Sequence, residues 1–119
     1  MPRAAGSRSK VGHVTDDVTP KGLKARLDRH EPVVLLDVRE HWEAALCRLE
    51  HSIHIPIEEL EHRTDEIDSQ EEIVVYCHHG VRSAAVVGYL RGLGFARVKN
   101  LDGGLDGWAR DVDPEMRRY

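Results

Sequence analysis

Apolar residues recur along this chain in two spacings, which predict strands and helices in alternation. The runs VVLLD at 33–37 and IVVY at 73–76 are rich in valine, leucine and isoleucine and are bounded by turn residues. Short apolar runs of this kind are typical of strands buried on both faces of a sheet. Two further strands are expected, one in SIHIPI, where Pro56 ends it, and one at 96–100.

Segments with helical spacing lie between these strands. Thr19 and Pro20 are typical of an N-cap and a first helical residue, and they predict a helix over 20–29 with Leu23 and Leu27 on one face. Further helices are expected at 40–49, with Trp42, Ala45, Leu46 and Leu49 at core spacing, and at 58–63, 83–91 and 105–111. The acidic segment 65–72 is expected to be a solvated connection, and the glycine pair at 103–104 a turn.

The alternation of strands and helices predicts the fold class. It is typical of an α/β fold with a mainly parallel sheet, helices on both faces and right-handed crossovers. A chain of 119 residues suffices for one hydrophobic core, so we expect a single domain over 14–119. Residues 1–13 contain too little apolar surface to offset the entropy of ordering and are expected to form a flexible tail.

Composition and charge narrow the range of partners. The net charge is -4, with acids and bases interspersed, so no basic surface for nucleic acid is expected. No apolar run is long enough to cross a bilayer, and the N-terminal residues lack the apolar segment of a secretory signal. Two cysteines are too few for a disulfide-stapled scaffold. We therefore expect a cytoplasmic protein with no nucleic-acid partner and no membrane partner.

The candidate chemistry lies in the segment CHHGVRS, which follows the strand at 73–76. Cys77 stands at the carboxyl end of that strand, where the sites of parallel α/β sheets lie. A thiol is a good nucleophile as its thiolate, which a helix N-terminus and a nearby cation favour. We expect the backbone amides from His78 to Ser83 to converge on the sulfur as an anion nest with an open route for a small anion. The alternative is an inert buried cysteine.

Other residues of the loop also suit an anion site. Gly80 permits a backbone conformation that bulkier residues disfavour. Arg82 supplies a permanent cation that can bind an oxyanion in bidentate fashion, and Ser83 can cap the following helix. Together these features favour a functional cysteine.

The chain resembles the single-domain rhodanese-like sulfurtransferases. CHHGVRS, with IVVY before it and NLDGGLDGW after it, is similar to the active-site region of that family. Upstream, VVLLDVREHWEAALCRLEHSIHIPIEEL is similar to the family's first signature, and the resemblance extends from Thr19 to Tyr119. It implies a rhodanese-like, five-stranded, mostly parallel sheet flanked by helices on both faces.

The resemblance implies sulfur transfer through a cysteine persulfide. Cys77 would attack the outer sulfur of thiosulfate or a related donor, release sulfite and pass the sulfur to a thiophilic acceptor such as cyanide. No metal and no organic cofactor is implied. The partners would be a small sulfur donor and a thiophilic acceptor, or a sulfur-accepting protein.

Individual roles follow from the same resemblance. Cys77 matches the sulfur carrier, and Arg82 matches the arginine that closes the loop and binds the donor's oxygens. The residues expected to contribute mainly through backbone amides are His78, His79, Gly80, Val81 and Ser83. The residues expected to be structural are the pair Asp37 and Arg39 near the site and Trp108 in the core.

Two departures from the family pattern bear on activity. His78 and His79 stand where members that use thiosulfate well often have another cation, and histidine is uncharged for much of the time near pH 7. Weak thiosulfate turnover is therefore expected. In addition, Arg48 and His51 within RLEHS replace the usual His and Gly of the neighbouring loop.

Three alternative functions fit a cysteine loop of this kind less closely or equally well. A phosphatase with a Cys-Arg loop has five residues between the two, whereas four separate Cys77 from Arg82, which leaves less room for a phosphate. A regulatory module without chemistry is disfavoured because the whole loop is present. A persulfide relay that hands sulfur to a protein acceptor stays open.

The remaining cysteine and the histidines are expected to have structural roles. Cys47 is expected to be a buried helix cysteine rather than a disulfide partner of Cys77. Adjacent histidines cannot easily share one ion, and His51 and His54 have no clear partners, so no zinc site is expected.

Overall fold

Strands and helices alternate as the hydrophobic pattern predicts. A computed structural model describes residues 16–119, and the tail predicted over 1–13 lies outside the described residues. In chain order the elements are β2 (Asp17–Val18), α1 (Pro20–Asp28), β3 (Val34–Asp37), α2 (His41–Leu46), β4 (Ile53–His54), α3 (Ile57–Leu60), the 3-10 helix η2 (Thr64–Glu66), β5 (Ile73–Tyr76), α4 (Val81–Gly92), β6 (Val98–Leu101) and α5 (Gly104–Asp111). Over this range no helix combines the length and apolarity that crossing a bilayer requires.

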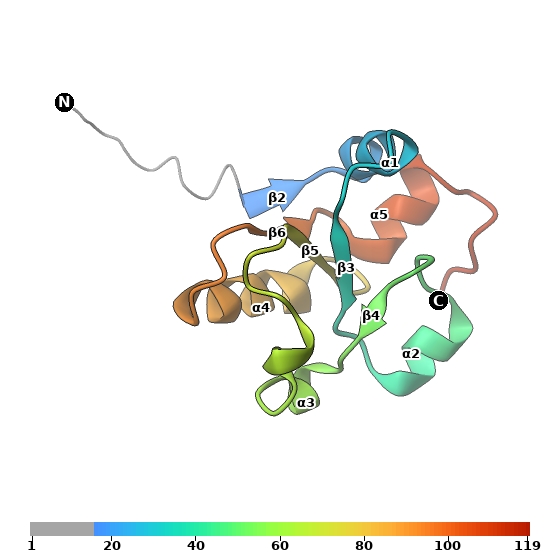
Figure 1. Ribbon diagram of the computed structural model, residues 1–119. Coiled ribbons are helices and arrows are strands. Elements are labelled where there is room, and N and C mark those ends of the chain that lie inside the picture. The colour runs from blue at the N-terminus through green and yellow to red at the C-terminus, as the bar shows by residue number, and fades with distance from the viewer. Residues whose placement is uncertain (1–15) are drawn as a thin grey trace.

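The strands form one five-stranded sheet in the order β2-β6-β5-β3-β4 (Figure 1). Each neighbouring pair is parallel, and Asp37 at the end of β3 lies opposite both Tyr76 of β5 and His54 of β4. The carboxyl ends of the strands therefore meet at one edge. The predicted α/β class with a parallel, rhodanese-like sheet is confirmed.

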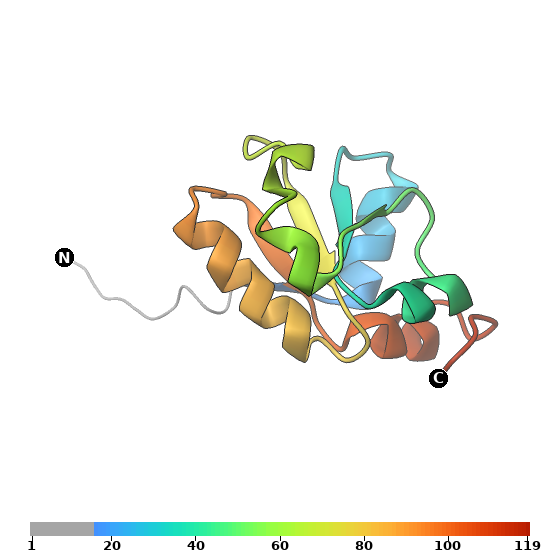
Figure 2. The same ribbon diagram turned by 90° about the horizontal axis from the view of Figure 1, so that it is seen from below.

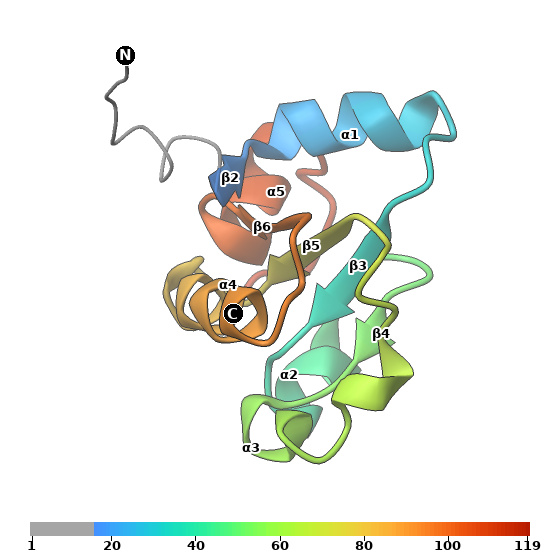
Figure 3. The same cartoon turned by 60° about the vertical axis from the view of Figure 1, so that its left-hand side comes forward.

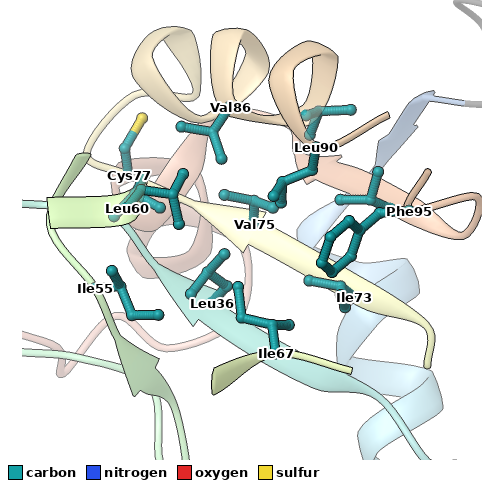
Figure 4. Packing of buried hydrophobic residues seen from close by; sticks show 13 residues of the cluster. Leu36, Ile55, Leu60, Ile67, Ile73, Val75, Cys77, Val86, Leu90 and Phe95 are labelled. Carbon is teal, nitrogen blue, oxygen red and sulfur yellow. The ribbon is translucent and has the colours of Figure 1, made fainter. Parts of the chain in front are cut away.

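Alternating side chains divide the core between the two faces of the sheet. On one face, Leu36 and Val75 pack with Val86 of α4 in a cluster that also includes residues of α3 (Figure 4). On the other face, Leu35 and Trp108 pack with residues of α1 and α5, which lie side by side (Figure 3). Each large apolar side chain buried in this way contributes about 1.5–3 kcal/mol relative to exposure.

Helix α2 differs from the sequence prediction in its length and in the side chains that it buries. It spans His41–Leu46 rather than 40–49, and Trp42, predicted to lie in the core, is 57% exposed. The reason is a capping box, in which the side chains of Glu40 and Glu43 reciprocally accept backbone N–H bonds and start the helix. This places Glu43 on the buried face. Helix α2 lies at the carboxyl edge of the sheet, beside the C-terminal segment (Figure 2).

Several boundaries also differ from the predicted ones. Helix α4 begins at Val81, and its N-cap is Gly80 with φ 95°, so the prediction that Ser83 caps this helix is wrong. Strand β6 lies at Val98–Leu101 rather than 96–100, and α3 is limited to Ile57–Leu60. The acidic connection is not wholly solvated, because Ile67 is buried in the core. Strand β2 has only two residues and no periodic pattern that could predict it.

Candidate functional site

Cys77 follows β5 directly and lies at the carboxyl edge of the sheet. Its sulfur is on the side covered by α4 (Figure 4). The Sγ atom accepts hydrogen bonds from the amides of Gly80 at 3.1 Å and Ser83 at 3.3 Å. Of the amides from 78 to 83, these two donate to the sulfur in the described chain. The predicted convergence of amides on the sulfur is therefore present, but two amides take part rather than all of those from 78 to 83.

The carbonyls of the same loop are held by α5. The amides of Leu105 and Asp106 donate to the carbonyl oxygens of Cys77 and His78, each at 2.9 Å. These two donors belong to the first turn of α5, whose N-cap Gly103 has no side chain to satisfy them. The loop thus caps α5, and its carbonyl dipoles are directed to the helix rather than to the sulfur.

Gly104 is the point of closest approach between α5 and the loop. It has φ +60°, and a Cβ atom built there would lie 2.5 Å from the carbonyl oxygens of both Cys77 and His78. No side chain fits that space without moving the loop backbone. The glycine pair interpreted as a turn is also a packing requirement of the cysteine loop.

A buried polar chain lies behind the sulfur. The Ser83 hydroxyl oxygen is 3.3 Å from Sγ and donates to the side-chain oxygen of Asn100 at 2.5 Å. The amide nitrogen of Asn100 donates to the Gly80 carbonyl and to the Asp17 carboxylate, both at 3.2 Å. Asn100 was not predicted as a site residue. The sequence gives little signal for it, because its neighbour Lys99 in the same strand is polar as well.

The guanidinium group of Arg82 is already paired with a carboxylate. Its guanidinium binds the carboxylate of Glu43 in bidentate fashion, with N–O distances of 2.7 and 2.8 Å. The Glu43 side chain is 4% exposed and also accepts a hydrogen bond from the Tyr119 hydroxyl at 2.8 Å. The Arg82 hydrogen bonds, opposed by burial, lower the pKa of Glu43 to about 2. Arg82 is therefore a cation of the loop as expected from the sequence, but Glu43 neutralises its charge in this structure.

Asp37 and Arg39 form an ion pair in which both side chains are fully buried. The Arg39 guanidinium also donates to the carbonyl oxygens of Glu43 and Cys47 and to the Tyr119 hydroxyl. Every one of these partners lies on α2 or beyond it, so Arg39 anchors α2 to the end of β3. A buried charge with this many acceptors is satisfied rather than reactive.

The two histidines of the loop form part of an aromatic stack. The His78 ring lies 4.0 Å from the His79 ring and 3.9 Å from the Tyr119 ring, centroid to centroid. Burial, with a smaller effect of His79, lowers the pKa of His78. This shift disfavours the charged form of His78, so the residue is a poor substitute for a permanent cation in the loop.

The sulfur is closed off from solvent, and the nearest hollow beside Arg82 has acidic walls. Cys77 is 1% exposed, so the open route expected for a small anion is absent from this conformation of the described chain. A hollow of about 150 Å³ lies beside Arg82, and its walls are Val38, Glu40, Ile57, Glu58 and Arg82. A larger hollow of about 570 Å³ lies at the other end of the sheet, near Leu27 and Trp108, and contains none of the predicted catalytic or substrate-binding residues.

Cys47 lies apart from Cys77. It is the half-buried residue that ends α2 and packs with the cluster on the α1 and α5 face, whereas Cys77 belongs to the cluster on the opposite face. A disulfide between them would need a rearrangement of the sheet edge. Within residues 16–119, no three His, Cys, Asp or Glu side chains are grouped closely enough to hold a metal ion.

The fold and the cysteine loop define a parallel α/β protein with a buried cysteine, whose sulfur accepts two backbone amide hydrogen bonds, at the carboxyl edge of its sheet. Residues 19–111 match the model of the rhodanese-like domain, and the chain belongs to this family. A "Sulfurtransferase" of Allochromatium vinosum is 33% identical over 82% of this chain and 91% of its own length. The thiosulfate sulfurtransferase GlpE of Actinobacillus pleuropneumoniae is 34% identical over 78% of this chain and 86% of its own.

Further relatives place the same domain in different contexts. The chain spans 26% of the adenylyltransferase and sulfurtransferase MOCS3 of Xenopus laevis, to which it is 33% identical over 81% of its own length. A crystal structure of a rhodanese-like domain protein from Staphylococcus aureus superimposes with a TM-score of 0.76, at 29% identity, over 87% of this chain and 98% of that one. This chain is therefore a rhodanese-like sulfurtransferase-family domain.

The contact between Gly104 and the loop predicts that replacement by alanine affects stability differently at Gly104 and at Gly88. Gly104→Ala should lower the free energy of unfolding by about 2 kcal/mol or more, because the new Cβ must displace the loop carbonyls. Gly88→Ala is the matched control, since nothing lies within 4 Å of a Cβ at that position of α4, and it should stabilise by about 0.5–1 kcal/mol. Denaturant unfolding of both variants measures the difference. Equal effects would contradict the proposed packing constraint.

The Glu43–Arg82 pair predicts a pH dependence of stability. Because the folded-state pKa of Glu43 is about 2, against 4.5 as reference, the stabilisation from its ionised form is present above pH 4.5 and is lost as pH falls toward 2. Glu43→Gln should therefore cost about 1–3 kcal/mol at pH 7, and the difference should shrink between pH 4.5 and 2. Glu61→Gln, at an exposed position, is the control and should show neither effect. A pH-independent difference would argue against the ion pair as the cause.

Proposed function

We propose that Cys77 carries a sulfane sulfur as a persulfide and transfers it from a donor to a thiophilic acceptor. The observation that carries this proposal is the pair of amide donors, Gly80 and Ser83, on the Cys77 sulfur. Backbone N–H groups stabilise negative charge without themselves carrying a proton that can be lost. The same donors would serve a thiolate and the persulfide formed from it, since both are anions.

Two displacements on sulfur make up the proposed cycle. In the first, the Cys77 thiolate attacks the outer sulfur of thiosulfate or a related donor, a new S–S bond forms, and the electron pair of the broken bond leaves with sulfite. In the second, a thiophile such as cyanide attacks the outer sulfur of the persulfide and forms thiocyanate. The electron pair then returns to Cys77 as thiolate. No redox partner is required, and one difficult transfer is divided into two.

Arg82 is the residue proposed to admit an anionic donor. It lines the hollow next to Glu40 and Glu58 and is 37% exposed, so a sulfonate can reach it from solvent. The sulfonate oxygens would take the place of the Glu43 carboxylate on the guanidinium fork. Because Glu43 is already ionised and bidentate, this exchange is costly, and the acidic walls oppose a doubly charged anion. Weak thiosulfate turnover is therefore part of the proposal.

The acceptor in a cell can be a protein rather than a small thiophile. Relatives with this domain include an enzyme named as both an adenylyltransferase and a sulfurtransferase and a putative sulfur carrier protein. A persulfide relay of this kind would use the same Cys77 chemistry. Two free thiols are best maintained in a reducing compartment, which supports a cytoplasmic location.

Replacement of the nucleophile tests the proposed function. Cys77→Ser should abolish thiocyanate formation from thiosulfate and cyanide, and mass spectrometry should no longer detect the addition of one sulfur atom after donor treatment. Cys47→Ser is the control and should retain both. Undiminished activity in Cys77→Ser would refute the mechanism, and release of phosphate from an aryl phosphate without thiocyanate would favour a phosphatase.

Replacement of Arg82 tests the donor contact. Arg82→Ala should raise the KM for thiosulfate about tenfold or more and change kcat less, because a ground-state contact worth about 1.4 kcal/mol or more is lost. Arg110→Ala removes an exposed arginine that pairs with the adjacent Asp111, and it should leave KM unchanged. Thermal unfolding of both variants controls for stability. An unchanged KM in Arg82→Ala would show that the donor binds elsewhere.

A further inference from the structure

Proton positions in the polar chain behind the sulfur can be assigned from the groups that surround Asn100. One end of its carboxamide faces the Gly80 carbonyl and the Asp17 carboxylate, each at 3.2 Å. Both of these groups accept hydrogen bonds and neither can donate, so this end must be the NH2 group. The other end, which faces Ser83, is then the carboxamide oxygen.

The orientation of Asn100 decides where the hydroxyl proton of Ser83 lies. The carboxamide oxygen can only accept, and it lies 2.5 Å from the Ser83 hydroxyl oxygen. Ser83 has one hydroxyl proton, which is committed to Asn100. The hydroxyl therefore presents its lone pairs, and not its proton, to the Cys77 sulfur at 3.3 Å.

From this geometry we infer that Ser83, oriented by Asn100, holds Cys77 in its thiol form at rest. The S–H group donates to the Ser83 oxygen, in opposition to the two amides of Gly80 and Ser83, which favour the thiolate. Ser83 and Asn100 are then positioning residues that set the balance between thiol and thiolate. The inference deepens the proposed sulfur transfer and rests on it, because it identifies what restrains the nucleophile.

The restraint is released only when the bond from Ser83 to Asn100 is broken, so it holds while Asn100 is in place. If the Ser83 hydroxyl rotates away from Asn100, its proton can point to the sulfur, and Ser83 changes from an acceptor to a third donor. The sulfur then has three donors in its anionic state. Ser83 is fully buried and Asn100 is 6% exposed, so no bulk water competes for these positions.

Other charged and titratable groups lie in the cysteine loop and on the elements packed around it, and the test must leave them in place. They are Arg82 on α4, Glu43 on α2, His78 and His79 in the loop, Asp106 on α5, Asp17 on β2, and the Asp37–Arg39 pair at the end of β3. None of them is replaced in the variants below. A difference between variants therefore reports on the hydroxyl.

The direction in which the pH midpoint of Cys77 alkylation shifts tests the inference. In the full chain, the pH midpoint for alkylation of Cys77 by iodoacetamide is measured, with mass spectrometry separating Cys77 from Cys47. Ser83→Ala removes the acceptor and keeps both amides, so the midpoint should fall by about half a pH unit or more. If Ser83 instead donates to the sulfur, the midpoint should rise. A rise or no change would overturn the inference. The midpoint is the readout because a less basic thiolate is also intrinsically less nucleophilic.

Two further variants complete the design. Asn100→Leu leaves Ser83 in place but frees its proton for the sulfur, so the midpoint should again fall, and no fall would count against the role of Asn100. Ser52→Ala is the matched control, because it removes a hydroxyl that is bonded to Tyr76 and Leu49, away from Cys77, and it should leave the midpoint unchanged.

A measurement on the unaltered chain covers the case in which the variants fail to fold. The infrared S–H band that disappears in Cys77→Ser should lie at lower frequency than that of a thiol in water, since a donating S–H bond is weakened. A band at the unbonded frequency would overturn the inference. Neither measurement uses a sulfur donor, so a failure of sulfur transfer counts against the proposed function alone.

Discussion

Hydrogen bonds between the cysteine loop and α5 are the constraint on which the site depends. The first turn of a helix has amides with no partner inside the helix, and a loop that reverses direction has carbonyls with the same need. Here Leu105 and Asp106 supply the amides, and Cys77 and His78 supply the carbonyls. Because these carbonyls are held on the α5 side, the turn at Gly80 can bring two amides to the sulfur. The glycine at 104 follows from the closeness of that contact.

A second constraint comes from four charges at the same edge, of which all but Arg82 are buried. Asp37, Arg39, Glu43 and Arg82 alternate in sign, and the Tyr119 hydroxyl connects Arg39 to Glu43. A buried charge is tolerated when it is paired, so each member of this series requires the next. The consequence for function is that Arg82 at rest is an ion-pair partner. An anionic donor must compete with a carboxylate that holds its charge down to about pH 2.

The sequence predicts the parts of this site that are local along the chain. The apolar runs identify β3 and β5, and Cys77, Gly80 and Arg82 are identified within one loop because strand, turn and helix follow each other directly. Glu43 and Asn100 are not identified, since their partners lie 39 and 17 residues away and only the folded sheet brings them together. The prediction that Trp42 lies in the core is wrong for a related reason. The capping box at Glu40 and Glu43 sets the orientation of α2, and a short helix at the end of a sheet has little room for a second buried face.

Under these constraints, the groups that would act on the sulfur differ from the groups that a donor would meet first. The amides on Cys77 and the hydroxyl of Ser83 act on the sulfur atom itself and are indifferent to the rest of a donor molecule. In the proposed transfer the donor would be selected outside the sulfur site, where Glu40 and Glu58 line the hollow beside Arg82 and the lowered pKa of His78 disfavours a cation. Val81, the first residue of α4, is 77% exposed and adds apolar surface beside the loop. For the proposed transfer, we expect a small dianion to gain little from such surroundings and a larger donor or acceptor with apolar surface of its own to bury Val81 as it approaches.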